Sequence, residues 1–167
     1  MPKIRDVLRD VTFFADGESY AGQCNQVTLP SLQLQTEEMR AGGMDAPKQM
    51  DMGMQSLSAS AQFNNVPVGI MRLFGKDGVE FVARGRLITS NGEDKGATAR
   101  LVGRITEDAP GDWQPGSPAS KSITIAVDVY KLSVDGEEVH HVDIENYIRV
   151  IDGVDMLERA RQILGIG

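Results

Sequence analysis

Two stretches of the chain alternate apolar and polar residues, and an insert rich in methionine separates them. In residues 32–38 leucine and threonine alternate with glutamine and glutamate, and in residues 56–63 apolar residues alternate with serine and glutamine. A period of two predicts two strands, each with one apolar and one polar face. The polar positions that we single out are Gln33, Gln35, Ser56, Ser58, Ser60 and Gln62.

The insert, at about residues 39–53, has the composition of a contact loop. Five of the chain's eight methionines lie between Met39 and Met54, and Gly42 and Gly43 allow a sharp turn. Such a segment cannot pack a core of its own. A solvated loop has no need of methionine, whereas a loop pressed against another surface gains soft apolar contacts from it.

The remaining pattern predicts a turn-rich, mainly β fold of the α+β class. Strands are expected at about residues 79–89, 97–107, 122–134 and 137–142. Between strands, Asp-Gly pairs supply the positive φ angles of tight hairpin turns. These pairs begin at Asp16, Asp77, Asp135 and Asp152.

One or two short helices complete the expected secondary structure. The first lies between Asn65 and Gly75, with Pro67 in its first turn, where the missing N–H costs nothing. Its core-facing residues are expected to be Ile70, Leu73 and Phe74. The second covers residues 155–164 and is stopped by Gly165.

Residues 108–121 contain three prolines and two glycines, which exclude a regular strand ladder or helix. We predict an excursion from one domain, residues 1–167, rather than a linker between two domains. Trp113, the only tryptophan, is expected to pin this loop to the body of the fold.

Composition excludes several classes of protein. The single cysteine, Cys24, rules out an internal disulfide. A formal charge of −7 argues against binding nucleic acid by phosphate neutralisation. No apolar run reaches the roughly 18 to 20 residues of a membrane span, and the N-terminus lacks the apolar core of a secretion signal.

We find no set of residues typical of a catalytic or metal site. The sequence has no Gly-x-Ser-x-Gly motif, and residues 69–77 depart from the phosphate-binding loop. His140 and His141 are adjacent on an expected strand and would point to opposite faces. Arginines such as Arg86 and Arg100 suit a solvated sheet face balanced by acids at least as well as an anion site. We therefore predict a protein that is not an enzyme and has no cofactor and no metal.

A β domain with exposed strands and a contact loop has the anatomy of an assembly subunit. Exposed strand edges invite pairing from neighbours, and a closed ring of identical subunits removes those edges. The alternative that the strands alone permit is a monomeric β-barrel that binds a small molecule or a peptide. The methionine-rich insert favours assembly, because a closed monomeric barrel has no use for it.

Five separated blocks of the sequence resemble the major tail tube protein family of contractile-tailed bacteriophages and R-type pyocins. They cover nearly the whole chain in order. The blocks are FADGESYAG (14–22), TLPSL (28–32), TEEMRAGGMDAP (36–47), YKLSVDG (130–136) and IDGVD (151–155).

The resemblance implies a β-sandwich or open-barrel subunit with a flanking helix. Six copies form a ring, the strands of the ring join into one continuous inner β-barrel, and rings stack into a tube. The family's long loop reaches the adjacent ring, and the insert occupies that place here. The expected inter-ring contacts are Met39, Arg40, Gly42, Gly43, Met44, Asp45, Met50 and Met52.

The resemblance also implies partners and a location. These are other copies of the chain, the tail sheath protein, baseplate and tail-terminator proteins, and, in a phage, DNA that passes through the lumen without specific binding. The tube would belong to a virion tail or a pyocin-like particle assembled in the host cytoplasm, with no membrane anchor. If the polar positions of the two alternating strands face the lumen, they give a hydrated wall with few cations, which would not hold a polyanion.

Overall fold

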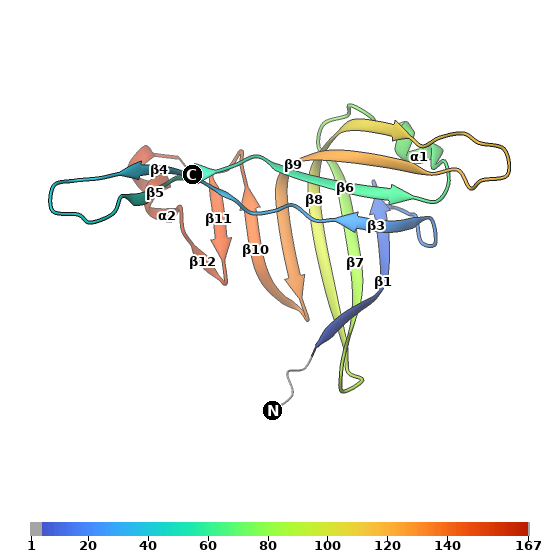
Figure 1. The fold of residues 1–167 in the computed structure, drawn as a ribbon, viewed down its shortest axis with the longest axis horizontal. Helices are drawn as coiled ribbons and strands as arrows, with labels where there is room; N and C mark the ends of the chain where they lie inside the picture. Colours follow the sequence, from blue (N-terminus) through green and yellow to red (C-terminus); the bar gives the residue numbers. More distant parts are fainter. Residues whose placement is uncertain (1–4, 167) are drawn as a thin grey trace.

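The computed structural model describes residues 5–166, and the fold of this part of the chain is mainly β (Figure 1). It has the following elements: β1 (Asp6–Ala15), β2 (Glu18–Ser19), β3 (Cys24–Thr28), β4 (Leu34–Met39), β5 (Lys48–Met54), β6 (Leu57–Phe63), α1 (Val68–Met71), β7 (Val79–Thr89), β8 (Asp94–Pro110), β9 (Lys121–Val134), β10 (Glu137–Asp143), β11 (Ile148–Ile151), β12 (Val154–Asp155) and α2 (Glu158–Leu164). The expected class, mainly β with short helices, is confirmed.

Strand β9 is the strand on which the sheets meet. It pairs with β8 along its length, with β6 over residues 121–127, and with β10 over residues 129–134. The main sheet therefore runs β12-β11-β10-β9-β8-β7-β1-β2, while β6 and β3 branch from β9. In Figure 1, β6 and β3 cross over β7, β8 and β1, so that the two layers enclose the core as an open barrel.

The core is a cluster of aromatic and aliphatic side chains between these two layers. Phe13, Phe63 and Phe81 are at most 1% exposed. The ring of Phe13 lies 5.8 Å from that of Phe63 and 5.9 Å from that of Phe81, centroid to centroid. Edge-to-face and offset contacts of this kind add to the burial of about 150–250 Å² for each ring. They fix the crossing of β6 over β1 and β7.

The alternation in residues 56–63 is confirmed by β6. Its apolar residues are buried, and Ser58 and Gln62 are exposed on the other face. The strand thus has one face in the core and one polar face outside, as the period of two predicts.

The alternation in residues 32–38 has a different outcome. All six residues of β4 are exposed, so the expectation of a half-buried strand is wrong there. Residues 48–54, expected to belong to a loop, form β5 and pair with β4. The connecting loop is therefore shorter than expected, residues 40–47. The two strands make a separate sheet that projects from the body (Figure 1).

The helices are shorter than expected. Helix α1 begins after Pro67, which is its N-cap residue, and no side chain caps it. Ile70 is buried, as expected, but Phe74 is 53% exposed because the helix ends before it. Helix α2 ends at Gly165, whose φ of 69° confirms the expected stop.

Candidate assembly surfaces

The sheet of β4 and β5, called the ribbon below, presents methionine on one face. In its register Met39 pairs with Lys48 and Glu37 pairs with Met50. By strand alternation Met39, Met50 and Met52 therefore share one face of the ribbon with Glu37 and Lys48. Their exposed fractions are 57%, 43% and 55%. Large apolar side chains of this kind on a two-stranded sheet are typical of a surface that contacts another molecule. The structure thus brings together three of the eight predicted contact residues on a strand face.

The other predicted contact residues lie in the loop at the ribbon's tip. Gly43 has a φ of 88°, which confirms the need for glycine in the sharp turn. Met44 is half-buried, and its sulfur accepts a hydrogen bond from the backbone N–H of Ala41 at 3.5 Å. Arg40, Gly42 and Asp45 are exposed.

The base of the ribbon is tied to the body by one ion pair. Oδ2 of Asp51 accepts a hydrogen bond from Nη2 of Arg149 at 2.8 Å, and Oδ1 of Asp51 accepts one from the backbone N–H of Gly53 at 2.8 Å. The Gly53 N–H and the Arg149 guanidinium hold the pKa of Asp51 below its ordinary value. This contact joins residues 98 positions apart in the chain, and no local sequence signal indicated it.

Acid is expected to loosen the ribbon through Asp51. A carboxyl whose pKa is lowered by folding stabilises the fold above its unfolded pKa of about 3.9, and this contribution is lost as the pH falls through the folded pKa. In unfolding titrations, Asp51→Asn should be less stable than wild type at neutral pH, and the two stabilities should converge as the pH falls through the lowered folded pKa of Asp51. Asp45→Asn, at the tip of the same ribbon, is the control. An unchanged difference across this range would contradict the role of the Asp51 charge.

The polar positions of the alternating strands do not all share one surface. Ser58, Ser60 and Gln62 lie on the outer face of β6, whereas Gln35 lies on the ribbon. The neighbouring strands extend the β6 face with further uncharged polar residues, which sequence reasoning missed because they are recognised only through strand register. These are Gln26, Thr28, Ser122 and Thr124. Gln33 and Ser56 are exposed beside the segment that joins the ribbon to β6.

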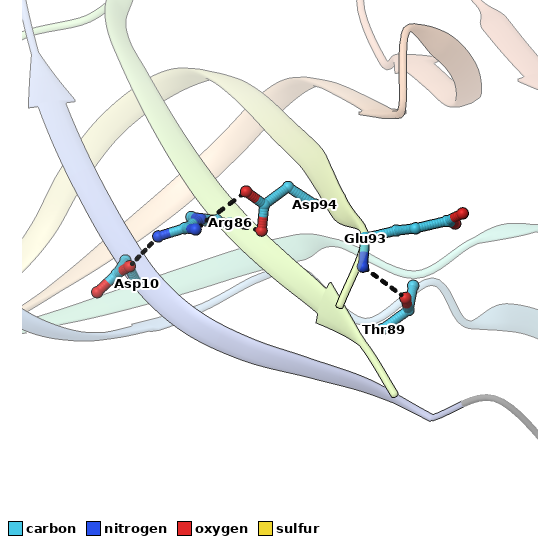
Figure 2. Close-up of polar contacts among 5 residues, drawn as sticks. All are labelled: Asp10, Arg86, Thr89, Glu93 and Asp94. Atoms are coloured by element: carbon cyan, nitrogen blue, oxygen red, sulfur yellow. Dashed lines mark hydrogen bonds and ion pairs between the residues drawn. The ribbon is translucent and has the colours of Figure 1, made fainter. Parts of the chain in front are cut away.

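The arginines of β7 and β8 are paired with acids. Arg86 lies between Asp10, at 3.6 Å, and Asp94, to which it donates two hydrogen bonds of 3.2 and 2.9 Å (Figure 2). Arg100 contacts Glu80 at 2.9 Å. These pairs are exposed, so each contributes little to stability. They support the interpretation of a solvated sheet face and not that of an anion site.

The excursion predicted at residues 108–121 is a second projection, called the Trp113 loop below (residues 111–120). Its base is closed by a 2.8 Å hydrogen bond from the backbone N–H of Gly111 to the carbonyl of Ser120, and by Lys121, whose Nζ lies 2.5 Å from Oδ1 of Asp108. Trp113 itself is 79% exposed, so the expectation that it pins the loop to the body is wrong. The core is filled by phenylalanines and aliphatic residues without it.

Between residues 5 and 166, no group of three or more His, Cys, Asp or Glu side chains is placed to hold a metal ion. In the same range no helix is long and apolar enough to cross a membrane.

Comparison with known proteins gives the family. The family described as phage tail tube protein FII matches residues 5–165. The chain belongs to this family. Among its curated relatives, the major tail tube protein of Serratia phage KSP20 is 32% identical over 164 residues, covering 96% of each chain. The tail tube protein of Escherichia phage P2 is 28% identical over 166 residues, covering 95% of this chain and 96% of that one.

Solved structures share the fold of this family member at low sequence identity. A chain from the cryo-EM structure of the PVC sheath-tube complex in the extended state, from an extracellular contractile injection system, matches with a TM-score of 0.57 and 16% identity. The match covers 74% of this chain and 87% of that one. A chain from the anti-feeding prophage cap matches with a TM-score of 0.56, 12% identity and the same coverages.

Family membership confirms the resemblance read from the five sequence blocks. The protein is a structural tail tube protein and not an enzyme, and tail tube proteins are components of virions or related particles. The alternative of a monomeric small-molecule or peptide binder is not favoured.

Proposed function

We propose that this chain forms homohexameric rings that stack into the inner tube of a contractile tail or a pyocin-like particle. The observation that carries the proposal is the ribbon, in which all six residues of β4 are exposed beside a row of methionines. An isolated two-stranded hairpin is marginally stable in water. Contact with the adjacent ring would cover the methionine face and stabilise the ribbon.

The uncharged polar face of β3, β6 and β9 is the candidate wall of the lumen. Ser58, Ser60 and Gln62 lie there, and hydroxyl and amide groups hydrate well without attracting phosphate. Because cations on such a wall would retain a polyanion, their absence from these three positions suits DNA that passes without binding.

The tube would be built in the host cytoplasm and meet sheath, baseplate and terminator proteins. Two structural relatives come from a sheath-tube complex and from a tube-terminating cap, which supports sheath and terminator proteins as partner classes of the present chain. Helix α2 is a candidate outer surface, because it has no buried residue and its Ile163 is 70% exposed.

Assembly is tested by sizing and negative-stain microscopy of the purified protein over a range of concentrations. We expect rings of six subunits at low concentration and hollow tubes at high concentration. A protein that stays folded and monomeric at every concentration would overturn the proposal and favour the monomeric binder.

The lumen assignment is tested with Ser58→Lys and Ser60→Lys together. In a phage these changes would add twelve positive charges for each six-subunit ring, so DNA ejection should slow markedly, and more so at low salt. Asn91→Lys, at an exposed position in the turn between β7 and β8, is the control. Ejection at the wild-type rate would mean that β6 does not face the channel.

A further inference from the structure

A cavity lies at the base of the ribbon, where residues 53–57 pass over the end of the β10–β11 hairpin. Its volume is about 330 Å³, which falls in the range of binding pockets. The walls are mostly apolar and include Met54, Ile144, Tyr147 and Leu157. Asp143 also lines the cavity, and both of its carboxylate oxygens accept hydrogen bonds from Asn146. Ile144 is 49% exposed and Tyr147 is 39% exposed, so this part of the molecule offers an open apolar site.

Arg149 gives the cavity an unmet need for hydrogen-bond acceptors. The residue is 8% exposed and lines both this cavity and an adjoining one of about 280 Å³. Nη2 of Arg149 donates a hydrogen bond to Asp51, but Nε and Nη1 are buried without a hydrogen-bond partner among residues 5–166. Nδ1 of His140, which lines the adjoining cavity, is also buried without a hydrogen-bond partner among these residues. Buried donors normally have partners, so these groups suit a site completed by another molecule.

The Trp113 loop has the chemistry that complements this cavity. Trp113 is 79% exposed, and Asp112 beside it is also exposed. The loop's closed base and its prolines reduce the entropy lost when it docks. Tryptophan and arginine are the residues that most often carry the binding energy of protein interfaces. An indole beside a carboxylate therefore matches an apolar cavity beside an arginine.

The two surfaces lie at opposite ends of the molecule. Figure 1 shows the ribbon at one end of the long axis and the loop between β8 and β9 at the other. The ribbon of one subunit is about 20 Å long from the rise of its strands. If this ribbon lies along a second copy, one end of the second copy lies beside the base of the first subunit's ribbon, where the cavity is. A contact between opposite ends can repeat from copy to copy.

We propose that the Trp113 loop of one subunit docks in the cavity at the ribbon base of a subunit in the adjacent ring. The indole would lie among the apolar walls of the cavity, and the Asp112 carboxylate would face the Arg149 guanidinium. This inference rests on the proposed assembly. The occupant is a second copy of this chain, because the loop and the cavity are complementary parts of the same molecule.

Fluorescence of the single tryptophan tests the docking on the unmodified protein. Acrylamide should quench Trp113 readily in subunits at low concentration. In finished tubes we expect quenching to fall several-fold and the emission to shift to the blue. If no tubes form, the proposed function itself fails. If tubes form and Trp113 is still quenched as in subunits, or is shielded only after sheath protein is added, the docking on a second copy is overturned.

Removal of a like-charge repulsion tests the cavity. Ile144→Glu places a carboxylate beside the expected position of Asp112 and should raise the concentration needed for assembly about tenfold. Adding Asp112→Asn removes the repulsion without bringing a cation to Arg149 and should restore part of the assembly. Val154→Glu, on β12 outside the cavity and 62% exposed, is the matched control and should assemble normally. Failure of the second change to rescue the first, with both variants folded, would overturn the placement of the loop.

Discussion

Replacing Met50 and Met52 with lysine is expected to abolish tube growth while the subunit stays folded. Both side chains are about half exposed in the subunit, so the fold does not need them. Because about half of each side chain is already buried in the subunit, each substitution would forfeit about half of the value for full burial, about 0.7–1.5 kcal/mol, and would bring a charge into the contact. Because the loss recurs at every subunit of every ring, microscopy should show no tubes at concentrations where wild type is fully assembled.

Met71→Lys is the matched control for this change. Met71, in α1, is 41% exposed, close to the 43% of Met50, but it lies outside the ribbon. It should form tubes as wild type does. Tubes from the ribbon variant at the wild-type concentration would show that the methionine face is not an inter-ring contact.

The largest effect on folding is expected for Gly103→Ala. Gly103 lies in β8 at a register irregularity against β9, and a Cβ there would overlap the carbonyl oxygen of Ala126. That oxygen belongs to backbone, so the paired strands would have to separate. Overpacking of this kind costs typically 1–3 kcal/mol and occasionally more, and we expect the upper end of that range in urea unfolding.

Gly96→Ala in the same strand separates this effect from the general effect of adding a methyl group. A Cβ at Gly96 would have no atom within 4 Å, so its substitution should change stability by less than about 1 kcal/mol. Equal loss of stability in both variants would mean that the close approach at Ala126 is not the cause.

Local signals in the sequence predicted local structure well. The Asp-Gly pairs at Asp16 and Asp135 both adopt positive φ at the aspartate and at the glycine, and both turn the chain between strands, because the turn depends only on those two residues. The expected strand at residues 79–89 has the bounds of β7, because alternation and turn residues delimit it on both sides.

What packs against each strand could not be predicted from the same local signals. The alternation in β4 resembles that in β6, yet β6 lies over the core and β4 lies outside it. A period of two shows that a strand has two faces, but what covers a face depends on distant residues. The ion pair of Asp51 and Arg149 has the same non-local origin. The exposure of Trp113 could not be predicted either, because it depends on a core that other residues had already filled.

The sharing of β9 ties the two layers of the body together without a hinge between them. Its first half carries β6, its second half carries β10, and β8 is bonded along both. A relative rotation of the two sheets would have to break hydrogen bonds along a continuous strand, whereas hinges in proteins usually lie in loops or at the ends of elements. A push delivered to one layer of the body is thus transmitted to the other with little loss to internal bending, which is what a part that punctures a barrier requires.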